Sequence, residues 1–297
     1  MKVVVLTPRS LAPVSRSIID ALKKRGVTVV KLSPARVALD LNNAEPDMVR
    51  KYFTEGEPRG AIVRGIGTSK TKKIYTRLGV LELFEDCGVY LLNSRKCLEA
   101  ATNKAITSYK LIKQGIPTPR TILCEGFKAA TEAFKKLGGD VVLKPLFGSK
   151  GVGIMRLTDE GFASNIFYNL DRLDEVFYIQ EYVEHGNYDI RAMVLGDEVI
   201  CAMKRVNATD LAQPWKTNVA AGAQGESIEI SSELKELAIK SAKAVGGEFM
   251  GIDIAETASG PMIIEVNSVP GFTELQKTTS IDIAGALADY FLAKLKR

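Results

Sequence analysis

The sequence contains a single histidine, His185, among its 297 residues. A Ser-His-Asp hydrolase would have to use this one side chain as its base, and metal sites built from several histidines are excluded within one chain. Catalysis by this protein must therefore depend on carboxylates, lysines, arginines, amides and backbone groups.

Cysteine is also sparse, and no two cysteines form a C-x-x-C pair. Cys87, Cys97, Cys124 and Cys201 lie ten or more positions apart. This spacing supports neither a disulfide framework nor a cysteine zinc site. A reducing cytoplasm is the expected location.

Long apolar segments are missing as well. The longest unbroken apolar run covers residues 199–203 and is far too short to cross a bilayer. The first residues lack the apolar stretch and cleavage site of a signal peptide. We therefore expect no contact with a membrane.

The remaining composition is that of a globular protein, with 46% hydrophobic and 25% charged residues. The length allows about two ordinary domains, or about three small ones that share an interface. The net charge of +5 is spread along the chain, which favours anionic ligands. No basic stripe interleaved with aromatic residues is present, so nucleic acid is not an expected partner.

The first part of the chain alternates strand and helix patterns. Strands are expected at residues 3–6, 27–32, 61–64 and 89–92, and helices at 15–25 and 74–86. Such alternation predicts a small parallel α/β domain that ends near Asn93. One long helix is expected at 94–114, stopped by Gly115, Pro117 and Pro119.

The second part has a different pattern. Residues 121–183 are expected to form strand, helix, strand, glycine-rich turn, strand, helix and strand in that order. Residues 188–205 and 249–267 are typical of antiparallel hairpins with turns at 196–197 and 258–260. This part is predicted to be α+β.

The second hairpin carries acidic residues. If it pairs symmetrically about Ser259, Asp253 faces Glu265 across the two strands, with Asn267 on the same face as Glu265. Ile252, Ile254, Ile264 and Val266 would then point to the opposite, buried face.

Like charges directly opposite one another destabilise a sheet, and we expect no counter-charge on this face. A divalent cation would supply one, and a set of oxygen ligands suits magnesium or manganese. The alternative is a solvated polar face with the register shifted by one residue.

A lysine in an apolar strand precedes a glycine-rich stretch. Lys144 ends the run 140–144, and Gly148, Gly151 and Gly153 follow within a few residues. A buried ammonium requires an anion, and glycines let backbone N–H groups approach a phosphate closely. The segment is not a Walker A loop. An ordinary glycine-rich hairpin loop is the alternative.

Two further segments could contact a ligand. The strand at 179–183 can offer backbone groups to an adenine edge, with an acid close by for ribose hydroxyls. The alternative is two ordinary strands joined by a turn at residues 185–187, in which His185 is a turn residue. Arg64 follows a strand of the first domain, where α/β ligands collect, and is a candidate contact for an acceptor carboxylate or phosphate. Lys70, Lys72, Lys73 and Arg77 are interpreted as a solvated charged face.

The runs EVNSVPG at residues 265–271 and KTTSIDIAG at 277–285 closely resemble the RimK-like amino-acid ligases of the ATP-grasp superfamily. The resemblance covers nearly the whole chain. It implies an ATP-grasp fold made of an N-terminal α/β pre-ATP-grasp domain (1–93), a central lid domain (94–184) and a C-terminal domain with a metal site (185–297).

The resemblance also assigns roles to individual residues. Lys104 and Lys144 would contact ATP phosphates under the loop of Gly148, Gly151 and Gly153. The other implied nucleotide contacts are Glu181, Tyr182 and Val183 at adenine, Asp189 at ribose, and Lys216, Thr217 and Asn218 on the far side. Asp253, Glu265 and Asn267 match the ligands of two Mg²⁺ or Mn²⁺ ions.

The implied reaction is ATP-dependent addition of an amino acid, L-glutamate, to an acceptor carboxylate through an acyl phosphate. Lys144, Arg191 and Arg205 would offset the charge on the transferred phosphoryl group. The acceptor is expected to be a small molecule such as tetrahydromethanopterin or the glutamyl-tailed coenzyme F420, with the C-terminal carboxylate of ribosomal protein S6 as the alternative. A homo-oligomer is compatible with this resemblance.

One departure from the family pattern concerns the acceptor. Ala221 stands where family members commonly carry an arginine, so Arg205 or Lys216 would have to replace that cation. A regulator that binds ATP and has lost catalysis is the rival interpretation.

Overall fold

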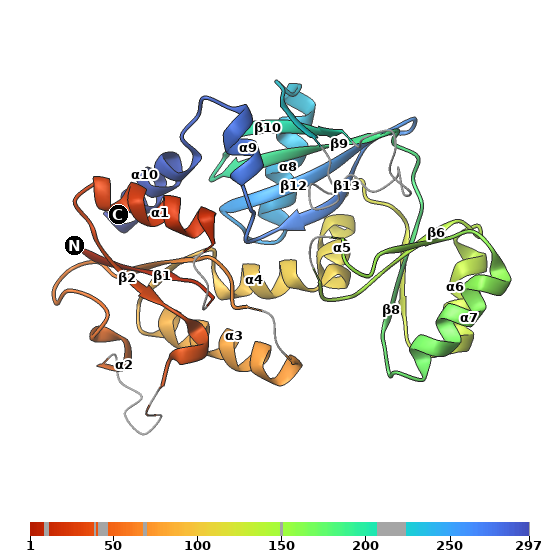
Figure 1. Cartoon of the computed structure of the whole chain (residues 1–297), viewed down its shortest axis with the longest axis horizontal. Helices are drawn as coiled ribbons and strands as arrows, with labels where there is room; N and C mark the ends of the chain where they lie inside the picture. Colours follow the sequence, from red (N-terminus) through yellow and green to blue (C-terminus); the bar gives the residue numbers. More distant parts are fainter. Residues whose placement is uncertain are drawn as a thin grey trace.

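The computed structural model describes residues 1–8, 12–38, 40, 47–67, 70–148, 151–206 and 224–296. These residues form three sheets (Figure 1). The first sheet and its helices lie on the left of the view, the largest sheet lies at the top, and the third forms a separate lobe on the right. Within the described ranges, no helix has the length and apolar character needed to span a membrane.

The first sheet has the strand order β2-β1-β3-β4, and all of its pairs are parallel. Its strands are β1 (Lys2–Leu6), β2 (Thr28–Leu32), β3 (Gly60–Val63) and β4 (Tyr90–Leu92). The segments around them are α1 (Pro13–Lys24), the 3-10 helix η1 (Pro34–Arg36), α2 (Asp47–Arg50) and α3 (Thr71–Asp86). The parallel α/β arrangement predicted from the alternating pattern is confirmed.

The two faces of this sheet are covered by helices from opposite ends of the chain. Leu78, Leu81 and Phe84 of α3 pack on one face. On the other face α1 lies beside α10 (Ile283–Leu295) (Figure 1). A Cβ on Gly60 of β3 would come within 2.7 Å of Phe291, so the last helix contacts the sheet directly.

Two helices connect the first sheet to the rest of the molecule. They are α4 (Arg95–Thr102) and α5 (Lys104–Lys113), so the single long helix expected at 94–114 is wrong. Asn103 interrupts it, because its side-chain oxygen accepts hydrogen bonds from the N–H groups of Ala105 and Ile106 at 3.0 and 3.3 Å. This capping begins a new helix at Lys104.

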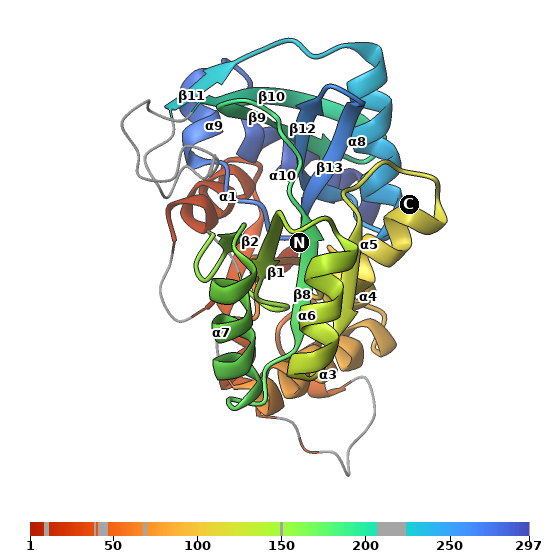
Figure 2. The same ribbon diagram turned by 90° about the vertical axis from the view of Figure 1, so that its right-hand side faces the viewer.

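The small sheet has the antiparallel order β5-β8-β6-β7. Its elements are β5 (Thr121–Cys124), α6 (Phe127–Lys136), β6 (Val141–Lys144), β7 (Met155–Leu157), α7 (Glu160–Asp171) and β8 (Phe177–Glu181). This is the element order expected from the sequence. Figure 2 shows α6 and α7 side by side against this sheet, where Phe134, Phe167 and Phe177 form its core.

The largest sheet has the antiparallel order β11-β10-β9-β12-β13. Its elements are β9 (Tyr188–Leu195), β10 (Glu198–Val206), β11 (Gln224–Ser227), α8 (Ser232–Ala244), β12 (Phe249–Thr257), β13 (Gly260–Asn267) and α9 (Thr273–Thr278). Both hairpins expected from the sequence are present.

Strand β9 passes through two different environments because successive side chains point to opposite faces. Ile190, Ala192 and Val194 lie in the core under α8. On the other face Met193 and Leu195 pack with the first sheet and α10. Asp189 and Arg191 share that second face but lie beyond its apolar core, which leaves a polar area at one end of the sheet.

Asn93, at the end of β4, joins the first sheet to the largest one. Its amide nitrogen donates to the carbonyl oxygens of Phe249 and Ser268 at 2.7 and 2.8 Å. Its side-chain oxygen accepts from the N–H groups of Glu248 and Phe249 at 2.8 and 2.9 Å. The side chain is buried, so all of these backbone groups would lose their partner together if the amide were removed.

We predict that Asn93→Ala lowers the free energy of unfolding by about 3 kcal/mol, because it leaves buried backbone groups without partners. Urea denaturation of the full chain measures the change. Asn169→Ala is the control, since Asn169 is exposed and bonds only to a carbonyl of its own helix, and it should shift stability by less than about 0.5 kcal/mol. Equal losses in the two variants would contradict the proposed role of Asn93.

Candidate active site

The hairpin of β12 and β13 has the register predicted from the sequence. Asp253 pairs with Glu265, and Gly251 pairs with Asn267. Beyond this point a β-bulge shifts the register, so that Ile254 pairs with Ile263. The prediction that Ile264 belongs to the buried face is therefore wrong.

The bulge decides which isoleucine is buried. Ile263 is 1% exposed and lies in the core under α8 together with Ile252, Ile254 and Val266. Ile264 is half-buried and lines the pocket on the other face. The extra residue leaves the pairing of the acidic residues intact.

Two buried carboxylates and two guanidinium groups form a continuous network across β9, β10 and β12. Arg205 donates to both oxygens of Asp189 at 2.5 and 2.6 Å, and its Nη2 lies 2.9 Å from Asp253 Oδ2. Arg191 contacts Asp253 through two nitrogens, one of them Nη2 at 2.7 Å. The strand register places Arg205 opposite Asp189 and Arg191 opposite Asp253.

This network corrects the expectation that the acidic face lacks a counter-charge. Burial disfavours the charged form of Asp253, but Arg191 and Arg205 outweigh burial and hold its pKa below the usual range. Burial also opposes the charge on Arg205, yet Asp253 and Asp189 raise its pKa. Asp189, which the resemblance assigned to ribose, is 1% exposed and has both oxygens on Arg205.

Glu265 differs from Asp253 in having no ion pair or hydrogen bond to a described residue. Burial raises its pKa, the charge on Asp253 raises it further, and Arg191, Lys104 and Lys144 act in the opposite direction. Such a carboxylate, half-buried beside a second one, is suited to accept a cation.

Asn267 is the third residue of the candidate metal site. Its amide nitrogen is buried and has no hydrogen-bond partner. Asp253 retains an unused lone pair on Oδ1, because that oxygen accepts from Arg191 alone. The oxygen donors of these residues therefore fit a hard divalent cation. No cluster of three or more His, Cys, Asp or Glu side chains suited to a metal occurs in the described ranges, so a site here depends on the amide.

Lys144, at the end of β6, lies across the pocket from these acids. Its Nζ donates to Gln180 Oε1 at 2.6 Å, and the amide of Gln180 donates to Thr121 Oγ1 at 2.9 Å. Burial lowers the pKa of Lys144 to about 8, an effect that Glu265 opposes and Lys104 reinforces. Gln180 was not among the predicted site residues, although it lies in the motif at 179–183.

Lys104 lies at the first position of α5, where its Nζ donates to the carbonyl oxygen of Gly148 at 3.2 Å. Burial lowers its pKa as well. The capping by Asn103 thus places this lysine at a helix N-terminus, a position that favours anions. The structure brings Lys104 and the glycine-rich stretch together, as the resemblance implied.

The glycine-rich stretch joins β6 to β7. Gly151 and Gly153 have φ values of +71° and +78°, and a Cβ on Gly153 would come within 2.8 Å of Pro145. Phe147 and Val152 are 50% and 76% exposed, so apolar side chains on both sides of the loop face solvent.

The segment 181–183 forms another edge of the pocket. The N–H groups of Glu181 and Tyr182 donate to the carbonyl oxygens of Arg120 and Asp140. The guanidinium carbon of Arg156 lies 3.4 Å from the centroid of the Tyr182 ring and the side chain pairs with Asp140. Arg156 was missed from the sequence, because nothing in its spacing connects β7 to this segment.

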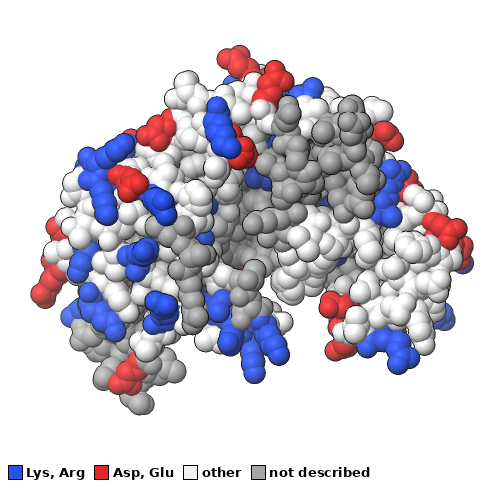
Figure 3. Space-filling view, viewed as in Figure 1, with Lys and Arg blue, Asp and Glu red and all other residues white. Residues whose placement is uncertain are grey.

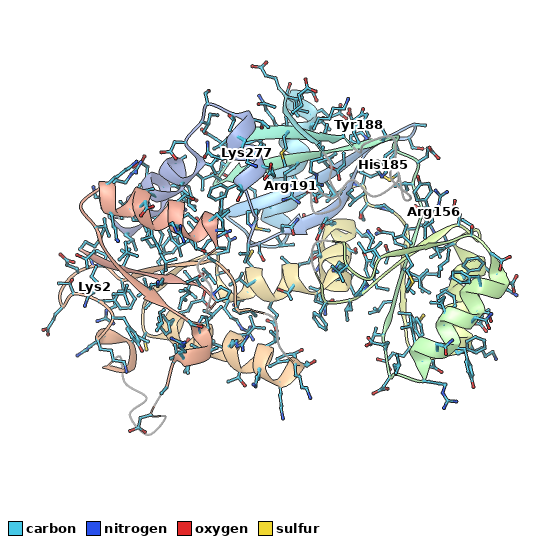
Figure 4. The ribbon with its side chains drawn as sticks, viewed as in Figure 1. Lys2, Arg156, His185, Tyr188, Arg191 and Lys277 are labelled. Carbon is cyan, nitrogen blue, oxygen red and sulfur yellow. The ribbon has the colours of Figure 1, made fainter. Side chains whose placement is uncertain are left out.

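One pocket, with about 640 Å³ of empty space that is partly open to solvent, brings most of these residues together. Lining residues that were predicted for the site are Lys144, Glu181, Tyr182, Val183, Asp189, Arg205, Asp253 and Glu265. Figure 4 marks Arg191 on the largest sheet, Arg156 on the small one and His185 in the connection between them. His185 contacts the carbonyl oxygen of Tyr188 at 2.9 Å, as a turn residue would.

Some predicted residues are not in this pocket. Lys216, Thr217, Asn218 and the departure at Ala221 lie outside the described residues. Arg64 lies at the carboxyl end of β3 and is not one of the residues that line the pocket.

The low pKa of Lys144 predicts a pH dependence for nucleotide binding. Below pH 8 its ammonium is charged and attracts a phosphate; as the pH rises above 8 it loses its proton, and the affinity for ATP should fall by up to about tenfold per pH unit. Calorimetric titration with ATP and Mg²⁺ between pH 7 and 9.5 measures this. Lys144→Arg, which keeps its charge, should show a flat profile, and an equal fall in that variant would assign the effect to another group.

Comparison with protein families agrees with this geometry. Residues 1–98 match the RimK PreATP-grasp domain, and residues 101–291 match the RimK-like ATP-grasp domain. A protein named probable alpha-L-glutamate ligase from Rhodopirellula baltica is 30% identical over 297 residues, which cover 99% of this chain and 72% of that protein.

Solved structures have the same fold. The RimK domain ATP-grasp protein of Sphaerobacter thermophilus has a TM-score of 0.75 at 22% identity, covering 98% of this chain and 100% of that one. The ATP-grasp ligase PsnB, solved with its minimal precursor, Mg and ADP, has a TM-score of 0.72 at 23% identity, covering 99% and 98%. The chain therefore belongs to the RimK-like ATP-grasp family, with a pre-ATP-grasp domain followed by a RimK-like ATP-grasp domain.

Proposed function

We propose that this protein is an ATP-dependent, ADP-forming carboxylate–amine ligase that adds L-glutamate to an acceptor carboxylate. The observation that carries the proposal is the pocket in which Lys144 of the small sheet faces Asp253 and Glu265 of the largest sheet. Cationic groups for phosphates and oxygen ligands for cations thus meet between the two sheets. The name of the relative from Rhodopirellula baltica supports glutamate as the added amino acid.

The reaction would proceed in two steps. The acceptor carboxylate attacks the terminal phosphorus of ATP, ADP leaves, and an acyl phosphate forms; the amine of glutamate then attacks the acyl carbon and phosphate leaves. Lys104 and Lys144 would orient the phosphates and offset their charge. Arg191 and Arg205 contact Asp253, and from there they would help to offset the charge on the transferred group.

Two Mg²⁺ or Mn²⁺ ions are part of this proposal, with Asp253, Glu265 and Asn267 as their ligands. When bound, such ions neutralise charge on the phosphates during transfer. The complex of PsnB with Mg and ADP supports magnesium in a protein of this fold. The residues themselves support it through the uncommitted Glu265 and Asn267 side chains.

The proposed acceptor is a small molecule, tetrahydromethanopterin or coenzyme F420, in the cytoplasm. Incubation with ATP, Mg²⁺ and L-glutamate should release phosphate only with the true acceptor, and the product should gain the mass of one glutamate residue. The same incubation with a peptide that has the C-terminus of ribosomal protein S6 tests the alternative acceptor. Nucleotide binding without turnover across all acceptors would favour the regulator instead.

Glu265→Gln tests the acidic residues. We expect turnover to fall by about 100-fold or more, because a cation would lose a charged ligand. Stability should not fall, since the change removes a partly buried charge whose pKa is already raised. Turnover and thermal unfolding are measured on the same preparation.

The matched control is Glu256→Gln, an exposed residue on the same hairpin that pairs with Tyr188. It should leave turnover unchanged; equal activity in both variants would remove Glu265 from the site. Asp253→Ala is a poor test, because it leaves Arg191 without its carboxylate and removes one of the two carboxylates paired with Arg205, which should destabilise the fold by about 3–5 kcal/mol.

A further inference from the structure

Arg64 is a buried guanidinium group that has no carboxylate partner among the described residues. Only 9% of the residue is exposed, and its Nε is buried with no hydrogen-bond partner. Its Nη2 donates to the carbonyl oxygen of Pro270 at 2.7 Å. Arg191 and Arg205, by contrast, each contact Asp253, so Arg64 is the arginine near this site whose charge is left uncompensated by the described residues.

A charged group in this environment is costly. Burial lowers the pKa of Arg64 to about 10, and no neighbouring carboxylate offsets the effect. A single carbonyl oxygen satisfies one donor of a guanidinium group that has five. A bound anion would satisfy the buried Nε as well, in the way that arginine pairs with carboxylates elsewhere.

The position of Arg64 connects it to the candidate active site. Pro270 follows β13, three residues after Asn267. A Cβ on Gly251 would come within 2.9 Å of Pro270 and 3.1 Å of Arg191 Nη1, so both residues pack around the same glycine. Arg64 thus contacts the segment that borders Arg191.

The surroundings of Arg64 are also cationic. The backbone N–H of Arg64 donates to the carbonyl oxygen of Leu6 at 2.7 Å. Arg64 therefore lies where the carboxyl ends of β1 and β3 meet. Arg77 of α3 donates to the carbonyl oxygen of Ile66, and no described acid forms an ion pair with it. Figure 3 shows Lys and Arg side chains gathered near the start of α3, where Lys72 and Lys73 are exposed. Such an edge attracts anions.

We propose that Arg64 binds a non-reacting carboxylate of a substrate, at the junction between the carboxyl end of β3 and the segment that follows β13. This inference depends on the proposed function for the identity of its ligand, since both the added glutamate and a glutamyl-tailed acceptor carry such a group. A phosphate of ATP is not the ligand, because Lys104 and Lys144 hold that end of the pocket.

Direct binding tests the site without any need for turnover. In protein labelled with ¹⁵N-arginine, the Nε–H signal of Arg64 is identified by its loss in Arg64→Lys. Two probes are titrated in the presence of Mg²⁺ and a non-hydrolysable ATP analogue: L-glutamate, and N-acetyl-L-glutamyl-L-glutamate as an acceptor mimic. We expect the Arg64 signal to shift with one of the two probes, and that probe identifies the substrate. The diamide of L-glutamate, which has no carboxylate, is the control and should cause no shift.

Kinetics provides the second measurement. Arg64→Gln should raise the KM for the responding carboxylate substrate by about 10- to 100-fold, as expected for loss of a charge-assisted hydrogen bond, and change the KM for ATP less than twofold. Arg25→Gln is the matched control, since Arg25 also joins the first and last parts of the chain, through Asp289. It should change neither KM.

The outcomes separate this site from the reaction. If the wild-type protein forms product, but no probe shifts the Arg64 signal and Arg64→Gln lowers only thermal stability, the inference is wrong and the proposed function stands. A rise in the KM for ATP equal to that for the carboxylate would also overturn it. A shifted signal in a protein that forms no product would keep the anion site and remove the ligase.

Discussion

The candidate site depends on the ion-pair network that joins Asp189, Arg205, Asp253 and Arg191 across neighbouring strands of the largest sheet. Each member is buried or nearly so, and removing Asp253 would leave Arg191 charged without the carboxylate that it contacts. The network therefore fixes both the side-chain positions and the alignment of β9, β10 and β12. Its two guanidinium groups neutralise the charge of Asp253. Glu265 is therefore the acid near Lys104 and Lys144 that has no ion pair with a described residue.

This arrangement gives the pocket separated charges of both signs. Glu265 has no ion pair with any residue in the part of the chain that the structure describes, and Lys144 donates to a neutral amide, Gln180. Burial works against both charges, raising the pKa of one and lowering that of the other. A ligand that brings phosphates together with cations would satisfy the two groups at once, because each component neutralises the residue that the other cannot.

Local patterns predicted the helices and strands well, because the alternation of apolar and polar residues and the turn residues can be read from neighbouring positions in the sequence. The pairing of Asp253 with Glu265 followed from the hairpin alone. The bulge at Ile264 did not, because a single inserted residue leaves no mark on the apolar pattern. The break at Asn103 was missed for a similar reason: the residues on both sides favour a helix, and the cap becomes visible only through its hydrogen bonds.

Contacts between distant segments were beyond the reach of the sequence pattern. Arg191 and Arg205 were expected near a phosphate, but the pairing of Arg191 with Asp253 depends on β9 lying beside β12, some sixty residues along the chain. Arg156 over Tyr182 and Arg64 on Pro270 have the same origin. The family resemblance assigned individual residues to nucleotide binding. What each of those residues contacts depends on how the three sheets pack.

The position of α10 has a consequence for how this polypeptide acquires its shape. Leu287, Phe291 and Leu295 complete the apolar layer that Val3, Val5 and Ile18 begin. During synthesis the first sheet leaves the ribosome well before α10, and the part of its face that α10 covers stays exposed to water until α10 has been made. A segment far along the sequence is thus a structural part of the first sheet, so the sheet cannot complete its apolar core before α10 has been made.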